Sequence, residues 1–512
     1  MWWGLPGDVS WAVDSIDPKV VIDGEWNYPY PPLHRYLLYL LYSPIILAAN
    51  WGWIDLSTIF DSSLLRFLGR GLSVFMGTGI ILIVFLTGLE VFKKRLPALL
   101  SAFFVLGIVS MVYYSKTMNV EVPYVFWFAG AMLFYVRAIE SDRFVDYLLF
   151  FVAASLSVCT KDQAYGLFIL PSIFLVYNHF KRAEKRPLIK TIIDFLIKLI
   201  LPFLLGAMVF LAAHQILVDI TVFIRHLGRL NSASYDASEF FVRSQNNIQE
   251  HLFLMYRFFR DIRFNLGWPL FAIALISILS CLFKRKEKSL LLCLLLPCLS
   301  YYLFFISIIL YSRDRFLLPV CLILCLFCGD VIADFIEDRN KWRSRLKIGW
   351  VSVICIYSLM YANSVNLLML QDSRYTAENW MGQNLDFPTE LGYVGFLQYH
   401  PRYDRLEGVE AGGISPSNLS ETVEKQSSPY IVTTRGYYRD RFPENTDEYR
   451  GFQALENSPS KYELVFEYKS SPIWNFLEIK TATEREFYDS RFKAGNFNKI
   501  NPEIRIFKRV EN

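Results

Sequence analysis

The chain has 512 residues, of which 54% are hydrophobic, 17% are aromatic and only 20% are charged. A soluble domain carries about 25% charged and about 45–50% apolar residues, so this composition excludes a soluble cytosolic enzyme, a disordered protein and a disulfide scaffold. The net charge of +4 is too small for this length to indicate a nucleic acid as the partner. The composition instead indicates a polytopic membrane protein.

The N-terminal segment, 1–63, is acidic and aromatic, and it contains an apolar stretch at 33–50. A proline pair precedes this stretch and two tryptophans follow it. Because Trp and Tyr prefer the headgroup region of a bilayer, we expect 33–50 to be an interfacial or re-entrant helix. The alternative is an eleventh span, which would put residues 1–32 in the cytoplasm.

Further along the chain, ten segments are apolar and long enough to cross a bilayer, which takes about 20 residues, or fewer where flanking side chains snorkel. These segments are 66–89, 97–114, 121–138, 145–160, 164–180, 188–212, 265–283, 289–310, 316–336 and 347–367. The loops between them alternate between strongly basic ones, such as 93–95 and 181–186, and loops with few basic residues. The positive-inside rule places the basic set in the cytoplasm and the other set outside it.

The predicted organisation has three parts. Residues 1–63 form an extracytoplasmic first loop, 64–368 form a transmembrane domain with an outer loop at 213–264, and 369–512 form a small extracytoplasmic α/β domain. In the last part, β-branched and aromatic runs predict strands and one run predicts a helix. The strands are expected at 391–396, 430–433, 462–468 and 504–507, and the helix at 377–385.

The N-terminus conflicts with this topology. Ten spans that end outside must also begin outside, but no apolar span precedes the segment 33–50. We therefore expect that the start of the chain lies downstream of a missing first helix.

Two acidic residues are candidates for chemistry. Asp14 belongs to an acidic first loop, which is either a solvated loop or the source of a general base or metal-binding carboxylate near several tryptophans. Glu121 opens a predicted span, where a carboxylate is favoured by the helix dipole even without any function.

Four basic residues lie on outer turns, against the trend of the loop charges. They are Lys116, Lys161, Arg313 and Arg315. Snorkelling explains any one of them, but together they are suited to hold an anionic lipid headgroup such as a phosphate. The cysteines, including the CxxC pair Cys325 and Cys328, lie in apolar stretches and are interpreted as packing residues.

The opening Trp3-Gly4-Leu5-Pro6, followed by Asp14 and then by 28–38, resembles the first outer loop of the GT-C glycosyltransferases. The nearest branch is that of the protein O-mannosyltransferases and the lipid A aminoarabinose transferase. Later family markers follow in the same order: Tyr114 to Glu121, Thr160-Lys161, Arg313 to Pro319, Asp372 to Trp380, and Asn501 to Ile504. The chain departs from the family pattern at the acidic pair, because Ser15 follows Asp14.

This resemblance implies a GT-C-like fold that moves a sugar from a polyprenyl-phosphate donor to an acceptor hydroxyl outside the cytoplasm, with inversion. By analogy Asp14 is the general base and Glu121 a supporting carboxylate. Lys116, Lys161, Arg313 and Arg315 are then the candidates for binding the donor phosphate. The acceptor is a glycan, a lipid or a protein.

The sequence says less about cofactors and about functional classes other than a glycosyltransferase. We predict no metal site, although Asp14 and Glu121 could share a divalent cation, and no nucleotide or nucleic acid is expected. The main alternative to an enzyme is a transporter or flippase of a lipid-linked saccharide, and a membrane scaffold is a third class. Of these, the resemblance favours the glycosyltransferase.

Overall fold

The computed structural model describes two compact units, one that runs to Asn363 and one that starts at Ser364. The described residues are Ser15, 30–54, 63–184, 186–228, 246–283, 289–337, 341–395, 397–435, Phe442, 445–469 and 502–510. The predicted general base, Asp14, lies outside them.

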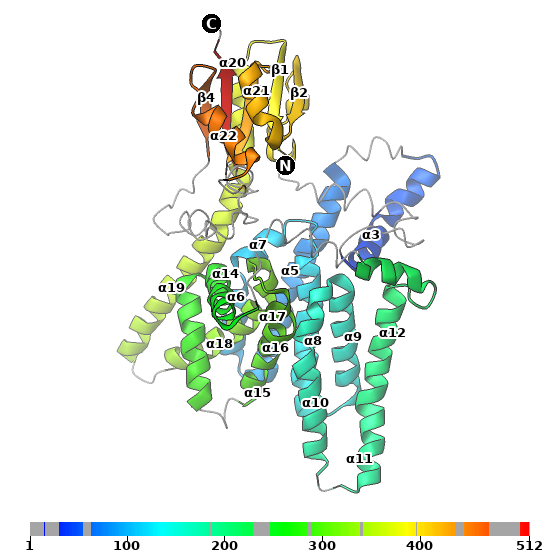
Figure 1. Cartoon of the computed structure of the whole chain (residues 1–512). Coiled ribbons are helices and arrows are strands. Elements are labelled where there is room, and N and C mark those ends of the chain that lie inside the picture. The colour runs from blue at the N-terminus through cyan, green and yellow to red at the C-terminus, as the bar shows by residue number, and fades with distance from the viewer. Residues whose placement is uncertain are drawn as a thin grey trace. The chain divides into compact units, whose positions relative to one another are not determined.

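The larger unit is helical (Figure 1). Its α-helices are α3 (Leu33–Asn50), α5 (Ser63–Phe92), α6 (Arg95–Val105), α7 (Val109–Tyr114), α8 (Glu121–Ser141), α9 (Phe144–Thr160), α10 (Ile169–Arg182), α11 (Leu188–Phe195), α12 (Leu201–Ala213), α14 (Ile248–Phe283), α15 (Ser289–Cys293), α16 (Leu295–Tyr301), α17 (Ser307–Ile309) and α18 (Leu318–Ile336). Helix α19 (Lys341–Leu370) begins in this unit and ends in the other. The described part of this unit also contains four short 3-10 or π segments, namely η1 (Asp162–Leu167), η2 (Leu196–Ile200), η3 (Tyr302–Ile306) and η4 (Asp314–Leu317).

Seven helices in the described part of the chain are long and apolar enough to cross a membrane. They are Leu64–Phe92, Glu121–Ser141, Leu188–Ala213, Ile248–Phe283, Ser289–Ile309, Asp314–Ile336 and Arg345–Asn384. Together with the C-terminal sheet described below, they confirm a polytopic helical membrane protein with a small α/β domain.

Three predicted segments differ in detail. The single span expected at 97–114 is wrong, because the helix stops at Val105 and resumes at Val109 across Leu106-Gly107, where glycine weakens a helix. The segment 164–180 begins as a 3-10 turn, so its α-helix starts only at Ile169. Helix α14 joins the expected surface helix to the following span and kinks at Gly267, whose φ of 71° is left-handed.

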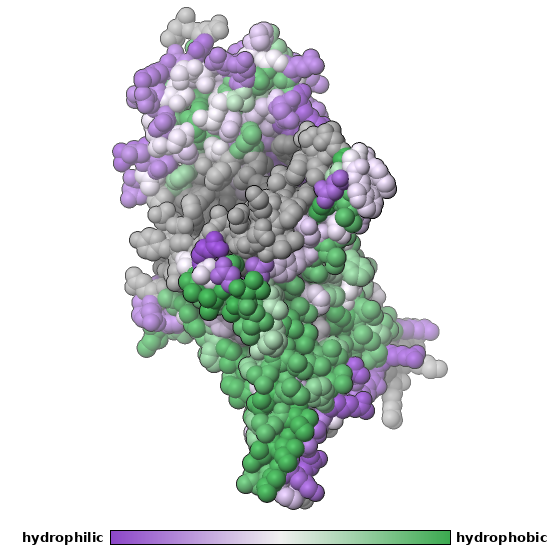
Figure 2. Space-filling model, turned by 90° about the vertical axis from the view of Figure 1, so that its right-hand side faces the viewer, coloured by the Kyte–Doolittle hydropathy of each residue, from purple (hydrophilic) through white to green (hydrophobic). Residues whose placement is uncertain are grey.

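Helices α8 and α9 form an antiparallel hairpin, with α5 packed on α8 and α12 on α9 (Figure 1). On the side of the unit where α11 and α12 lie, the surface is hydrophobic (Figure 2). Many of their large apolar side chains are exposed, including Leu188, Ile189 and Phe203. Such a surface is expected where a helix faces lipid.

The two ends of the helical unit differ in character. At one end, the basic loop after α5 is joined to the ends of α8 and α18 by the ion pairs Lys93–Glu140 (2.7 Å) and Lys94–Glu337 (2.8 Å). The opposite end brings together the start of α8, the end of α9 and the start of η4 and α18. The candidate site is built at this second end.

Helix α3 has the predicted bounds and buries a single stripe. His34, Leu38, Tyr42 and Ile46 are four residues apart and face inward, as the helical period requires. Their neighbours in this cluster include Met118, on the turn between α7 and α8. The opposite side of α3 exposes apolar residues, which is the pattern expected of an interfacial helix.

The smaller unit contains a five-stranded sheet in the order β2-β1-β3-β5-β4. The strands are β1 (Thr389–Val394), β2 (Val409–Ile414), β3 (Tyr430–Arg435), β4 (Tyr462–Tyr468) and β5 (Glu503–Arg509), and the helices are α20 (Ser373–Asn384), α21 (Leu419–Lys425) and α22 (Asp447–Glu456). Strands β1, β2 and β3 are parallel, whereas β5 is antiparallel to both β3 and β4. The sequence did not predict β2.

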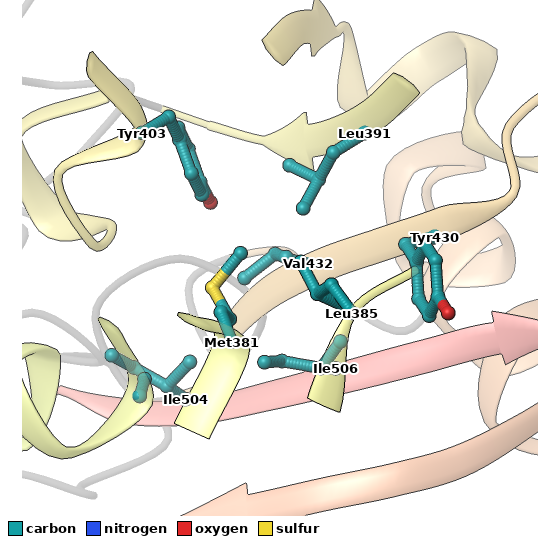
Figure 3. Packing of buried hydrophobic residues seen from close by; sticks show 9 residues of the cluster. Met381, Leu385, Leu391, Tyr403, Tyr430, Val432, Ile504 and Ile506 are labelled. Atoms are coloured by element: carbon teal, nitrogen blue, oxygen red, sulfur yellow. The ribbon is translucent and has the colours of Figure 1, made fainter. Parts of the chain in front are cut away.

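Helices cover both faces of this sheet. On one face α20 packs against β1, β3 and β5 through a cluster that contains Met381, Leu391, Val432 and Ile506 (Figure 3). On the other face α21 and α22 pack on Ile431 and its neighbours. Adjacent residues Ile431 and Val432 thus point to opposite cores, as the strand period of two requires.

Close helix packing in the larger unit yields a testable prediction. A Cβ at Gly329 on α18 would lie 2.5 Å from the carbonyl oxygen of Pro97 and 2.7 Å from the backbone nitrogen of Ser101, both on α6. Gly329→Ala should therefore destabilise the protein by about 1–3 kcal/mol, the usual cost of overpacking. The measurement is the thermal midpoint in detergent.

Gly71→Ala is the matched control, because a Cβ at Gly71 on α5 would meet nothing within 4 Å. It should be neutral or stabilise the helix by about 0.5–1 kcal/mol. Equal midpoints for the two variants would contradict the packing of α6 on α18.

Candidate functional site

Glu121 lies at the first position of α8, and its side chain is fully buried. Its Oε2 accepts a hydrogen bond from the Lys161 ammonium at 2.5 Å, and its Oε1 lies 3.4 Å from Nη1 of Arg315. The Lys161 side chain is only 4% exposed, so water screens this pair little. Three charged side chains from three segments therefore meet in a desolvated space, where each depends on its partners.

An extended residue precedes a 3-10 turn at two places near the site. Lys161 (φ −155°, ψ 116°) and Arg313 (φ −143°, ψ 149°) are both extended. Each is followed by an aspartate that opens a 3-10 turn, Asp162 in η1 and Asp314 in η4. An acidic residue is favoured there because the first turn of a helix carries partial positive charge. The break after α9 allows the Lys161 side chain to reach Glu121.

Aromatic rings surround the Lys161 ammonium. Its Nζ lies 5.1 Å from the ring centroids of Tyr124 and Phe316 and 5.9 Å from that of Tyr30. Aromatic faces attract a cation, and this attraction grows when water is excluded. Burial lowers the pKa of Lys161 to about 7, although Glu121 opposes that shift. An anion bound beside the ammonium would favour its protonated form.

Tyr124 links the two cations. Its hydroxyl accepts a hydrogen bond from Nε2 of Gln163 at 3.2 Å and donates to the backbone carbonyl of Arg315 at 3.5 Å. The carbonyl of Tyr124 accepts a hydrogen bond from the Ser157 hydroxyl at 2.9 Å. These bonds tie α8 to α9, η1 and η4, and so fix the spacing of the charged groups.

The structure brings Glu121, Lys161 and Arg315 together. Arg313 belongs to the same loop as Arg315, and its positive charge acts on Lys161. Burial lowers the pKa of the Arg313 guanidinium to about 10. Together these residues form a locally cationic site around one carboxylate.

The other predicted residues have different positions. Lys116 lies on the turn between α7 and α8, where its ammonium donates to the carbonyl of Val112 at 3.1 Å. Its partial burial lowers the pKa to about 8. Asp14 lies outside the described residues, so its assignment as general base stays a prediction.

Sequence reasoning missed the neutral residues of the site. Tyr124 follows Glu121 by one helical turn, Phe316 directly follows Arg315, and Gln163 follows Lys161 by two positions. This proximity to the charged residues was the available signal. It is weak because aromatic residues make up 17% of the chain.

The charged cluster does not fit a divalent cation. Both oxygens of Glu121 already face cationic groups, Lys161 and Arg315, which would repel a metal ion. Within the described ranges, no group of three or more His, Cys, Asp or Glu is arranged to hold one.

Comparison with known proteins adds a family to this geometry. Residues 36–206 match the family model of dolichyl-phosphate-mannose-protein mannosyltransferases. The match confirms the resemblance to these glycosyltransferases over that segment. The segment includes Glu121 and Lys161 and ends before Arg315.

No curated protein matches the chain in sequence. The oligosaccharyltransferase of Archaeoglobus fulgidus is 14% identical, with a TM-score of 0.40, over 99% of this chain and 89% of that one. ArnT of Cupriavidus metallidurans, in its apo state, is 13% identical with a TM-score of 0.41, over 84% of this chain and 88% of that one. The structure of the same protein bound to undecaprenyl phosphate is 11% identical in sequence, with a TM-score of 0.43, over 98% of this chain and 93% of that one. These TM-scores are too low to indicate a function for this chain.

The buried cluster predicts the effect of removing its carboxylate. Glu121→Gln would leave Lys161 and Arg315 without their shared counter-charge, and breaking a buried ion pair costs about 3–5 kcal/mol. The thermal midpoint in detergent should fall clearly.

Glu140→Gln is the control, because Glu140 pairs with Lys93 at a more exposed position. That change should cost no more than about 1 kcal/mol. A Glu121→Gln midpoint as high as that of Glu140→Gln would show that the cluster is not needed for stability.

Proposed function

We propose that the protein is a membrane glycosyltransferase that uses a polyprenyl-phosphate-linked sugar as the donor and a hydroxyl group as the acceptor. The family match of residues 36–206 supports the class of reaction. The observation that carries the proposal is the convergence of Lys161 and Arg315 on Glu121 at one end of the spanning helices. Lys and Arg are the usual protein ligands of a phosphate group, including that of a lipid.

Arg315 retains hydrogen-bonding capacity for such a ligand. Its Nη1 faces Glu121, but its buried Nε makes no hydrogen bond within the described part of the chain. A guanidinium binds a phosphate through two parallel N–H groups, which Nε and one Nη can supply. Lys161 would add a third positive contact, so that the two side chains stabilise the charge that develops on the departing phosphate.

The reaction we propose is a single displacement with inversion. The acceptor oxygen attacks the anomeric carbon, the bond from that carbon to the phosphate oxygen breaks, and the lipid phosphate leaves with the electron pair. Asp14 would take the proton of the acceptor hydroxyl as general base, an assignment that rests on the family resemblance. Glu121 would hold Lys161 and Arg315 in position for the phosphate.

We also propose that the site and the C-terminal domain face away from the cytoplasm. The strongly basic loop at Lys93 and Lys94 is joined to the ends of α8 and α18, whereas Glu121 and Arg315 lie at their starts. The positive-inside rule assigns the basic end to the cytoplasm.

The phosphate assignment predicts a loss of binding. Arg315→Ala should weaken the binding of undecaprenyl phosphate by about tenfold or more, because charge-assisted hydrogen bonds contribute about 1.5–3 kcal/mol. Arg315→Lys should bind the lipid more tightly than Arg315→Ala but more weakly than the unmodified protein, since an ammonium lacks the two parallel N–H groups of a guanidinium. The measurement is equilibrium binding in detergent micelles.

Arg182→Ala serves as the control, because Arg182 donates to backbone carbonyls at the opposite end of α8. Its affinity should match that of the unmodified protein. An Arg315→Ala protein that binds undecaprenyl phosphate as tightly as the control would refute the phosphate assignment.

The base assignment predicts a separation of binding from chemistry. Asp14→Asn should bind undecaprenyl phosphate normally but lose transfer by about 100-fold or more, as expected when a general base is removed. The measurement is transfer of a radiolabelled sugar from membrane lipids. Unchanged transfer would rule out Asp14, and lipid binding without any transfer by the unmodified protein would favour a flippase.

A further inference from the structure

The loop that carries both arginines is held by buried hydrogen bonds in addition to apolar packing. It joins α17 to η4 and starts at Leu310, which adopts a left-handed conformation (φ 59°) that is unfavourable for a leucine. Such a conformation persists only where surrounding contacts enforce it. Further along, the loop is hydrogen-bonded to α7 and α14 at Ser312 and Asp314.

On the α7 side, the Ser110 hydroxyl donates to Oδ2 of Asp314 at 2.8 Å. Ser110 is completely buried and Asp314 nearly so. Asp314 stands between Arg313 and Arg315 in the sequence, yet its carboxylate is engaged by this serine. The hydrogen bond therefore fixes the position of this carboxylate within the loop.

On the α14 side, the Asn265 amide nitrogen donates to the backbone carbonyl of Asp314 at 2.8 Å and to that of Asp261 at 3.2 Å. The Asp261 carboxylate in turn accepts a hydrogen bond from the Ser312 hydroxyl at 2.8 Å. Asn265 is fully buried, and the kink at Gly267 follows it by two residues. The loop is therefore fixed on both sides of Arg313.

We infer that Ser110 and Asn265 are positioning residues that hold Asp314 so that Arg315 is presented to the donor phosphate. This inference rests on the proposed function, because it assigns the network to the same anion site. Apolar side chains could hold a loop at lower desolvation cost than two buried carboxylates. A polar network has the advantage of fixing one orientation of the loop, since each hydrogen bond is directional.

The test is a double-mutant cycle that uses binding of undecaprenyl phosphate. Ser110→Ala should weaken binding by about three- to tenfold, the equivalent of one hydrogen bond. In an Arg315→Ala background the same change should have no further effect, because Ser110 acts through Arg315. Ser110→Thr, which keeps a hydroxyl donor, should restore the affinity.

Ser277→Ala is the matched control, because Ser277 is a fully buried serine on α14 whose hydroxyl has no hydrogen-bond partner among the described residues. Its affinity should be unchanged. If the losses from Ser110→Ala and Arg315→Ala are additive, or if Ser110→Ala binds like the control, the positioning role is refuted. Failure of the unmodified protein to bind the lipid would instead refute the proposed function.

Discussion

The structure of the site depends on the burial of one carboxylate between two cations. Glu121 can lie without water at the start of α8 only because Lys161 and Arg315 neutralise it, and each cation needs Glu121 for the same reason. This requirement constrains the end of α9 and the start of α18. Helix α9 must stop before Lys161, and α18 must be preceded by a 3-10 turn that delivers Arg315. The ring of Tyr124 lies beside the Lys161 ammonium, and its hydroxyl bonds to the backbone of Arg315.

The two carboxylates near the cations have different partners. Glu121 contacts Lys161 and Arg315 directly, whereas the Asp314 carboxylate is bound by Ser110. Three cations, Lys161, Arg313 and Arg315, accompany these two carboxylates, so the charges leave an excess of one positive group for a phosphate. The hydrogen bond from Ser110 fixes where the Asp314 carboxylate lies, and with it the loop that carries both arginines.

The sequence predicted most of the helices and four of the strands, because their apolar or alternating patterns are strong. It missed β2, since Val409–Ile414 contains two glycines and a glutamate and is largely exposed. In the site, Glu121 was recognisable because it closes an outer turn, 114–121, that resembles a marker of the glycosyltransferase family. Tyr124 and Asn265 were not, because their roles depend on hydrogen bonds to residues far along the chain. Sequence spacing carries no signal for such contacts.

The proposed function depends on a lipid phosphate that binds between Lys161 and Arg315. The most direct measurement is a cryo-EM structure of the full chain in lipid nanodiscs with undecaprenyl phosphate added. We expect phosphate density within hydrogen-bonding distance of the Lys161 ammonium and the Arg315 guanidinium, with Glu121 still in contact with at least one of them. Phosphate density at another place, with the Lys161–Glu121–Arg315 cluster unchanged, would refute this binding site.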